Sequence, residues 1–218
     1  MEKRGLLIVV SGFAGSGKGT LMKRLMGDYE NYALSVSMTT RDPRPGEVHG
    51  REYFFVSKEE FEQKIHEGGL IEYASYVEHY YGTPKDYVEE QMAAGKDVIL
   101  EIEIQGALKV KERFPDAVLI FVLPPSIEEL YRRLKTRGTE TEDVIRKRMG
   151  RAAEEVCAID KYDYIMINDE VEKSVKRLHG IIEAAHYTPG RNEEFIQTIK
   201  NGLTIKDSLT VKDVLEKL

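Results

Sequence analysis

A glycine-rich loop between two apolar segments constrains this chain more than any other feature. Residues 6–10 are all apolar, glycines recur through residues 12–20, and apolar side chains return at helical spacing from Leu21 to Met26. This order predicts a buried strand, a loop and a helix. In such a loop, consecutive backbone N–H groups surround an anion at the N-terminal end of the helix, where the helix dipole favours negative charge. The pattern therefore predicts a phosphate-binding site.

The loop residues supply what this chemistry needs. Gly12, Gly15 and Gly17 permit unusual dihedrals and a close backbone approach, and Lys18 can reach the β- and γ-phosphates of a nucleotide. The usual pattern has serine or threonine directly after the lysine, where this chain has glycine. Thr20 is therefore expected to place its hydroxyl near a phosphate or an Mg²⁺ water. The alternative is a strand-to-helix turn with one exposed lysine.

Composition limits the class of protein. The chain has 218 residues, of which 41% are hydrophobic and 32% charged, which suits one soluble globular domain with an inserted lobe. A net charge of −6 argues against a protein that binds nucleic acid over its whole surface. Cys157 is the only cysteine, and the sequence has neither an apolar run of eighteen residues nor a cleavable signal. We therefore expect no disulfide, no membrane span and a cytoplasmic location.

Strand and helix patterns alternate along the chain. Residues 98–104 and 117–123 are too apolar for a surface sheet, helical patterns at 105–113 and 126–136 follow them, and residues 164–168 resemble a last core strand. This alternation predicts an α/β fold with a doubly wound, three-layer parallel sheet. Ligands are expected at the carboxyl ends of its strands.

Other segments interrupt this alternation. Residues 53–56, 70–77 and 80–81 are expected to be short strands, Ser57 should open a helix, and Thr83 should cap another over residues 84–94. A basic helix is expected from Thr141 to Cys157. We expect one domain over residues 1–188, composed of a core (1–36, 89–125 and 158–188), an inserted lobe (37–88) and a lid (126–157), followed by a C-terminal helical extension (189–218).

Polar residues of the inserted lobe suggest two kinds of recognition. Arg41 and Arg44 lie in a proline-stiffened loop before Tyr53, and arginine forks with a phenolic hydroxyl suit a terminal phosphate. A solvated loop with surface ion pairs is the alternative. Glu72 lies among apolar residues, and one carboxylate can accept both N1–H and N2–H of guanine, whereas the N1 lone pair of adenine would repel it. A strand-edge charge facing water is the alternative for Glu72.

The expected lid is rich in positive charge. Its arginines would neutralise a transferring phosphoryl group when the lid closes. Lys135, Lys147 and Arg151 are more simply explained as a solvated helical face. The basic residues are Arg132, Arg133, Lys135, Arg137, Arg146, Lys147, Arg148 and Arg151.

Several short segments along the chain form one further pattern. They are residues 37–50, 53–56 and 80–83, Gln105-Gly106, residues 124–126, the run from Arg133 to Glu140, and residues 167–169. Together these segments resemble the signature of guanylate kinases, which are nucleoside monophosphate kinases with the P-loop NTPase fold. The resemblance covers residues 4–188 and implies Mg²⁺-dependent transfer of the ATP γ-phosphoryl group to GMP in purine nucleotide metabolism, without a covalent enzyme intermediate.

The resemblance also implies a role for individual residues. Catalytic roles fall to Lys18, Arg41, Arg137 and Arg148. ATP binding falls to Gly12, Phe13, Ala14, Gly15, Ser16, Gly17, Lys18, Gly19, Thr20, Arg133, Arg137 and Asn168. GMP binding falls to Ser37, Arg41, Arg44, Glu47, Tyr53, Glu72, Tyr81, Thr83 and Glu103. Mg²⁺ would be held mainly through phosphates and water, near Thr20 and Glu101.

This chain departs from the family pattern at a few positions. Glu101 and Glu103 stand where aspartates are common, and Phe13 and Ala14 replace the usual proline and serine of the loop. The expected partners are the two nucleotides alone, with no nucleic acid or membrane, in a monomer or homodimer. Two alternatives stay open: a kinase for another nucleotide, which Glu72 argues against, and a peptide-binding module of the same fold. Such modules typically lose the phosphate loop, which this chain keeps.

Overall fold

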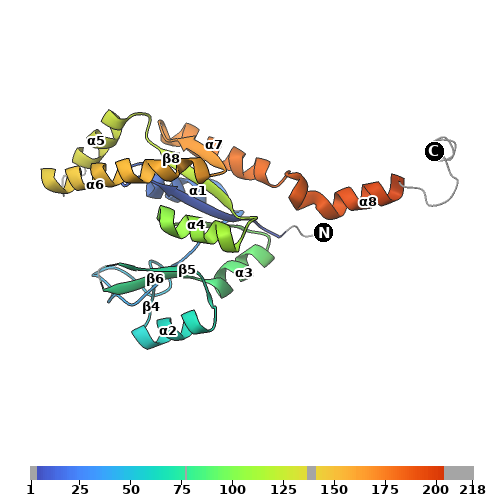
Figure 1. Cartoon of the computed structure of the whole chain (residues 1–218), viewed down its shortest axis with the longest axis horizontal. Helices are drawn as coiled ribbons and strands as arrows, with labels where there is room; N and C mark the ends of the chain where they lie inside the picture. The colour runs from blue at the N-terminus through green and yellow to red at the C-terminus, as the bar shows by residue number, and fades with distance from the viewer. Residues whose placement is uncertain (1–3, 77, 137–140, 204–218) are drawn as a thin grey trace. The chain divides into compact units, whose positions relative to one another are not determined.

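The computed structural model describes residues 4–76, 78–136 and 141–203 (Figure 1). The chain divides into two compact units, residues 1–178 and 179–218. The first unit holds both sheets and every residue of the site described below.

The central sheet consists of five parallel strands in the order β2-β7-β1-β8-β9. They are β1 (Leu7–Gly12), β2 (Tyr32–Leu34), β7 (Asp97–Glu101), β8 (Val118–Leu123) and β9 (Tyr164–Ile167). The middle residues of the strands are mostly apolar because helices cover both faces of the sheet. The predicted parallel α/β sheet is confirmed.

Alternate side chains of β1 point to opposite faces of the central sheet. Leu7 and Val9 pack with Ala107 and Val110 in one core cluster, and the intervening Ile8 points to the other face and is also fully buried. Figure 1 shows α4 on one side of the sheet and α1 on the other. The helices of this unit are α1 (Lys18–Asp28), α2 (Lys58–His66), α3 (Lys85–Ala93), α4 (Ile104–Arg113), α5 (Ile127–Thr136), α6 (Glu142–Glu155) and the start of α7 (Val171–Ala185).

A second, smaller sheet is inserted between β2 and α3. Its order is β4-β3-β6-β5, from β3 (Met38–Thr39), β4 (Phe54–Phe55), β5 (Leu70–Tyr76) and β6 (His79–Pro84). One face packs on α2, where the Phe61 and Tyr80 rings stack at a centroid distance of 5.2 Å. The other face meets α4, which lies between the two sheets in Figure 1.

The two predicted helix starts in this lobe have different outcomes. The capping box of Ser57 and Glu60 is confirmed, with both reciprocal hydrogen bonds present. The predicted cap of Thr83 is wrong: Pro84 occupies the N-cap of α3 and no side chain caps that helix. The physical reason is strand pairing, because β6 stays paired with β5 as far as Pro84. Thr83 is thereby kept inside the sheet, where it is fully buried.

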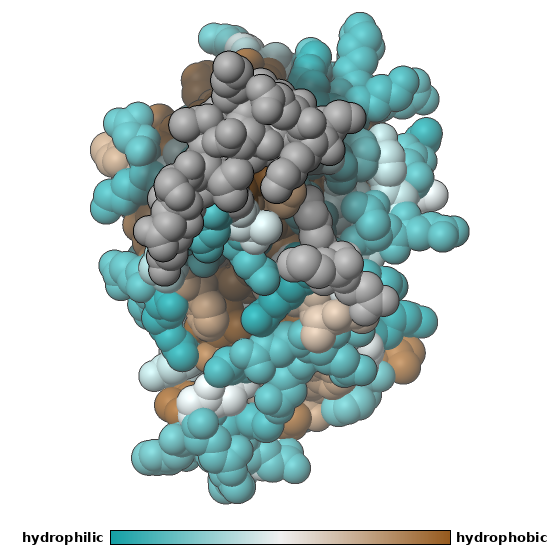
Figure 2. All heavy atoms as spheres, turned by 90° about the vertical axis from the view of Figure 1, so that its right-hand side faces the viewer, coloured by the Kyte–Doolittle hydropathy of each residue, from teal (hydrophilic) through white to brown (hydrophobic). Residues whose placement is uncertain are grey.

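The remaining segments are helical. The helix expected to reach Cys157 ends at Glu155 and tightens into the 3-10 helix η1 (Val156–Lys161). In the second unit, η2 (Pro189–Asn192) precedes α8 (Glu193–Leu203), and the rest of the expected extension lies outside the described residues. None of the helices in the described ranges is long and apolar enough to cross a membrane. Hydrophilic side chains cover most of the face seen in Figure 2.

Candidate functional site

The polar residues of the central sheet gather at the carboxyl ends of its strands. The loop follows β1 directly, Glu101 ends β7, and Asn168 follows β9. Strand register brings these ends together, because Gly12 lies beside Val122 of β8 and the next residue of β8 lies beside Ile167. Loops at this edge of a parallel sheet are where α/β proteins bind ligands.

The loop backbone has the shape that its glycines predict. Gly12, Gly15 and Gly17 have positive φ angles of 155°, 91° and 92°. Gly17 is also the N-cap of α1, and a Cβ there would lie 2.4 Å from Nδ2 of Asn168. Glycine is therefore required at position 17 both by its left-handed backbone and by lack of space.

Replacing Gly17 by alanine should weaken ATP binding roughly 100-fold, because the loop must change shape to admit the methyl group. The free energy of unfolding should fall by about 1–3 kcal/mol. Titration calorimetry with ATP and thermal unfolding measure the two effects. Gly27→Ala is the matched control, since a Cβ on Gly27 meets nothing within 4 Å in the described chain. Normal ATP binding by Gly17→Ala would show that this loop shape is not needed.

Lys18 lies back over the loop that precedes it. Its Nζ donates to the carbonyl oxygens of Gly12 and Phe13, at 2.5 and 3.3 Å. The same ammonium group faces Glu101. Neighbouring atoms displace water from that carboxylate and raise its pKa, an effect that Lys18 opposes and Glu103 reinforces. The lysine is thus positioned between the loop and the acidic end of β7.

Helix α6 reaches this acidic end through Arg151. Its Nη2 lies 3.4 Å from Oε2 of Glu103, and its Nε lies 2.9 Å from Oε1 of Glu155. Loss of solvent raises the pKa of Glu155, and the charge of Glu103 raises it further. Arg151, which the sequence favours as part of a solvated face, is 56% exposed but pairs with a predicted site residue.

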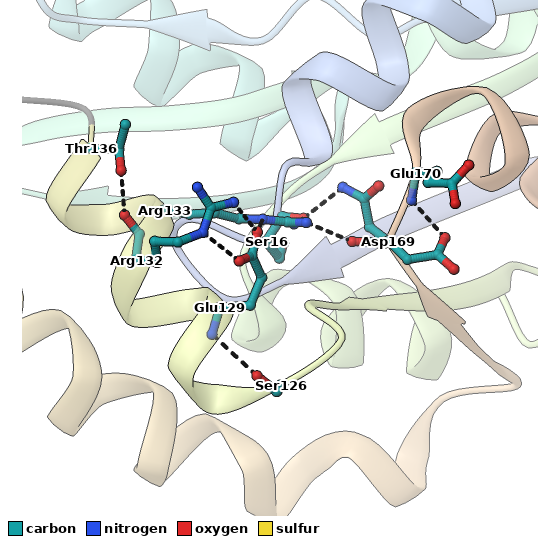
Figure 3. A network of polar contacts seen from close by, with 9 residues as sticks. Ser16, Ser126, Glu129, Arg132, Arg133, Thr136, Asp169 and Glu170 are labelled. Carbon is teal, nitrogen blue, oxygen red and sulfur yellow. Dashed lines mark hydrogen bonds and ion pairs between the residues drawn. The ribbon is translucent and has the colours of Figure 1, made fainter.

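The back of the loop is held by two polar side chains. Nη1 of Arg133 donates to the Ser16 carbonyl oxygen at 3.2 Å (Figure 3). Nδ2 of Asn168 donates to the same oxygen at 2.8 Å. Arg133 also donates to the Asn168 carbonyl oxygen at 2.9 Å. Ser16 Oγ and Asn168 Oδ1 are buried and have no hydrogen-bond partner within the described residues. Each could bond a ligand in the loop.

An arginine and two tyrosines form a cluster on the second sheet. Nη2 of Arg41 lies 3.0 Å from both carboxylate oxygens of Glu47, and its guanidinium lies 5.5 Å from the ring centre of Tyr53. Burial lowers the pKa of Arg41, but hydrogen bonds with Glu47 and Tyr81 outweigh it and leave the pKa raised. The Arg44 backbone N–H donates to Glu47 at 2.7 Å. Glu47 thus orients the predicted phosphate-binding arginine.

The carboxylate that the sequence predicts to read the base, Glu72, is buried on the same sheet. Glu72 is 8% exposed, and its Oε1 accepts a hydrogen bond of 2.9 Å from the Thr83 hydroxyl. Burial raises the pKa of Glu72, whereas Thr83 and the more distant charge of Lys109 lower it. A Cβ on Gly106 of α4 would lie 3.2 Å from the other carboxylate oxygen, so glycine makes room for it there. The alternative of a strand-edge charge facing water is excluded by this burial.

The other predicted site residues lie around these groups. Phe13 is buried against Phe121, with ring centres 5.2 Å apart, which explains an aromatic residue in the loop. Ser37 and Arg148 are half-buried, the latter on α6, while Ala14, Gly19, Thr20 and Arg44 are exposed. Arg137 lies outside the described residues.

Sequence reasoning missed two residues, Glu129 and Arg113, that hold other parts of the site in place. Glu129 bonds Arg132 and Arg133, although in the sequence it looks only like part of a helix cap. Arg113 donates to the carbonyl oxygens of Leu70 and Ile71, which ties α4 to β5 next to Glu72. The sequence carries no signal for Arg113, because its acceptors are backbone atoms about forty positions away. For Glu129, the spacing of four residues from Arg133 is such a signal.

Comparison with known proteins gives a consistent result. The family model described as guanylate kinase matches residues 4–185. A guanylate kinase of Caldanaerobacter subterraneus subsp. tengcongensis is 50% identical over 200 residues, which are 92% of this chain and 97% of that protein. One from Halalkalibacterium halodurans is 57% identical over 85% of this chain and 92% of its own. The crystal structure of guanylate kinase from Anaplasma phagocytophilum superposes with a TM-score of 0.68 at 33% identity, covering 88% of this chain and 91% of that one.

Proposed function

Because the chain belongs to the guanylate kinase family and phosphorylates GMP to GDP with ATP, we propose that its two sheets divide this work. The loop after β1 binds ATP, and the second sheet binds GMP. The observation that carries the proposal is the pair of Glu72 and Thr83, a buried carboxylate held by a hydroxyl on the face of the second sheet that meets α4.

The GMP side rests on strand geometry. Tyr81 and Thr83 are alternate residues of β6, so their side chains lie on one face, and Tyr80, which precedes Tyr81, packs on Phe61 from the opposite face. The face with Tyr81 and Thr83 is therefore directed toward α4. Glu72 on this face would accept N1–H and N2–H of guanine, and the arginine and tyrosine cluster would bind the phosphate. Ser37, Arg44 and Glu103 are proposed to contribute at the edges of this site.

The ATP side rests on the loop and its lysine. The loop amides would surround the β-phosphate, and the ammonium group of Lys18 would turn from the loop carbonyls to the transferring phosphoryl group. Asn168, whose Oδ1 is buried without a partner in the described chain, would meet the nucleoside part of ATP. Residues 126–157 are proposed as a lid that contributes Arg148 and Arg137.

The residues near the loop fit a magnesium ion bound with ATP. A threonine hydroxyl and a carboxylate, from Thr20 and Glu101, are hard oxygen donors of the kind Mg²⁺ prefers. Within residues 4–76, 78–136 and 141–203, no three His, Cys, Asp or Glu side chains form a cage of their own. An arrangement in which the ion takes most of its oxygens from phosphate and water suits this site. When bound, Mg²⁺ would neutralise charge on the ATP phosphates.

Catalysis would then come from alignment and charge neutralisation. The loop and the second sheet hold the donor and acceptor phosphates, and the fixed positive groups Lys18 and Arg41 offset the charge on the transferring group. No enzyme side chain forms a bond to phosphorus in this scheme. A monomer or homodimer and a cytoplasmic location stay predictions from the sequence.

A substrate panel tests the proposed acceptor site. The unmodified protein, supplied with ATP and Mg²⁺, should use GMP with a kcat/KM about 10⁴-fold above that for AMP, because adenine has a lone pair at N1 where guanine offers N1–H and N2–H side by side to the Glu72 carboxylate. A coupled assay for ADP with GMP, AMP, CMP and UMP measures this. Comparable use of AMP and GMP would contradict the role given to Glu72.

A further inference from the structure

Each nitrogen of the Arg133 guanidinium donates to an acceptor of the protein itself. Nε donates to Glu129 Oε1 at 2.7 Å, Nη1 to the Ser16 carbonyl oxygen at 3.2 Å and Nη2 to the Asn168 carbonyl oxygen at 2.9 Å. The side chain is 21% exposed. Figure 3 shows it extending from α5 toward Ser16 in the loop. A guanidinium engaged in this way has its fork committed to backbone carbonyls rather than to an anion.

The Ser16 carbonyl is the element of the loop that these contacts fix. Because a peptide unit is planar and trans, the Ser16 carbonyl and the Gly17 N–H point in opposite directions. Holding the carbonyl toward Arg133 and Asn168 therefore aims the next N–H away from them. Gly17 permits this orientation, since glycine readily adopts the left-handed φ of 92° and its lack of a Cβ leaves room for the Asn168 amide. Arg133 and Asn168, which we call the clamp, thus fix the direction of the Gly17 N–H, one of the amides proposed to bind phosphate.

Glu129 fixes the clamp in turn. It lies one helical turn before Arg133 and also accepts two hydrogen bonds from Arg132, at 2.6 and 2.7 Å. Bonds from Arg132 and Arg133 lower the pKa of Glu129 to about 2, so the carboxylate is ionised at neutral pH. Because the ionised Glu129 carboxylate holds Nε, the Nη1 and Nη2 groups of Arg133 are the ones that reach Ser16 of the loop and Asn168.

We propose that Arg133 is a positioning residue that holds the ATP loop in its phosphate-binding shape through the Ser16 carbonyl, and that Glu129 orients Arg133 for this task. The proposal rests on the ATP site described above. It assigns to Glu129 a part in ATP binding although the side chain touches no nucleotide. It also connects α5, the first helix of the proposed lid, to the loop by side-chain contacts.

Glu129→Gln separates this role from direct phosphate binding by the sign of its effect. If Glu129 orients the clamp, loss of its charge should raise the KM for ATP about tenfold, because hydrogen bonds to a charged group are worth about 1.5–3 kcal/mol. The KM for GMP and the kcat should stay within about twofold. If Arg133 instead bound phosphate directly, freeing it from Glu129 would leave the KM for ATP unchanged or lower it, and that result would overturn the proposal.

Arg132 and Glu128 provide matched controls. Arg132→Ala removes the other partner of Glu129 and leaves the contacts of Arg133 intact, so the KM for ATP should not change. Glu128→Gln removes a neighbouring charge whose hydrogen bond is to Ser126 instead. An equal rise in KM for ATP in these controls, or an equal rise for GMP in Glu129→Gln, would also overturn the proposal.

Arg133→Lys keeps the charge but loses the fork, and it supplies a second test should Glu129→Gln fold poorly. It should raise the KM for ATP at least as much, again without a matching rise for GMP. Failure of the proposed function is visible separately, because the unmodified protein would then form no GDP from GMP and ATP.

Discussion

Replacing Lys18 by alanine should lower kcat by about 10³-fold, the largest effect expected at any single position. The Lys18 ammonium is the fixed charge nearest the loop, where it hydrogen-bonds the Gly12 and Phe13 carbonyl oxygens. In the transition state of phosphoryl transfer, negative charge moves along the line between donor and acceptor oxygens, and a positive group beside the transferring phosphoryl group offsets that charge. Single-turnover measurement of GDP formation reports this step directly.

Lys23→Ala is the matched control for Lys18→Ala. Lys23 lies on the same helix and is exposed, so replacing it by alanine should change neither kcat nor the KM for ATP. Thermal unfolding should show both variants folded, because Lys18 is half-buried beside the loop and is not part of the hydrophobic core. Retention of near-full rate by Lys18→Ala would contradict the proposed donor site.

Replacing Glu72 by glutamine should lower kcat/KM for GMP by about 10²–10³-fold and leave the KM for ATP within about twofold. Two hydrogen bonds from guanine to a charged acceptor are each worth about 1.5–3 kcal/mol, and the glutamine amide would set a donor against one of them. Glu89→Gln, which changes an exposed carboxylate of α3, is the control and should match the unmodified protein. An equal loss for both nucleotides would show that Glu72 does not select the base.

The pH dependence of GMP binding gives the same position an independent test. Burial raises the pKa of Glu72. As the pH is lowered, the affinity of the unmodified protein for GMP should therefore begin to fall at a higher pH than it would if Glu72 had an ordinary pKa. The GMP phosphate also titrates, near pH 6, in any protein. Only the part of the pH profile that disappears in Glu72→Gln belongs to the carboxylate.

The raised pKa of Glu72 also determines whether its contribution to the stability of the fold grows or shrinks as the pH rises. A carboxyl group whose pKa is higher in the folded state contributes stability that is present at low pH and is lost as pH rises through the folded-state value. At pH 8, Glu72→Gln should therefore unfold at the same temperature as the unmodified protein or higher. Lost GMP use together with unchanged or higher stability would rule out a mere folding defect.

Most of the fold follows from periodicity in the sequence. The strand, loop and helix around Lys18 are confirmed because their apolar spacing and glycines are local features that few other structures satisfy. The burial of Glu72 could also be expected from its apolar neighbours. The cap predicted at Thr83 failed because pairing of β5 with β6, a non-local contact, took precedence over a local preference for capping.

Contacts made by backbone atoms could not be predicted in this way. The partners of Arg133 are carbonyl oxygens of Ser16 and Asn168, and a carbonyl has no signature in a sequence. The resemblance to a family suggested that Arg133 serves ATP, but only the geometry shows that its fork reaches the loop and not open solvent. The sequence likewise could not reveal that Glu47 orients Arg41, because a six-residue separation in a loop has no fixed geometry.

The second sheet, which we propose binds GMP, is encoded as one uninterrupted stretch, from the end of β2 at Leu34 to the start of α3 at Lys85. Recombination at those two crossings would exchange this sheet, with its Arg41 and Glu72, while the loop after β1 is inherited unchanged. Arg113 of α4 would be compatible with many exchanged segments of this kind, since it bonds main-chain oxygens of β5 and not the side chains of that strand. A chimaera with a new nucleotide preference thus needs one graft rather than coordinated changes throughout the gene.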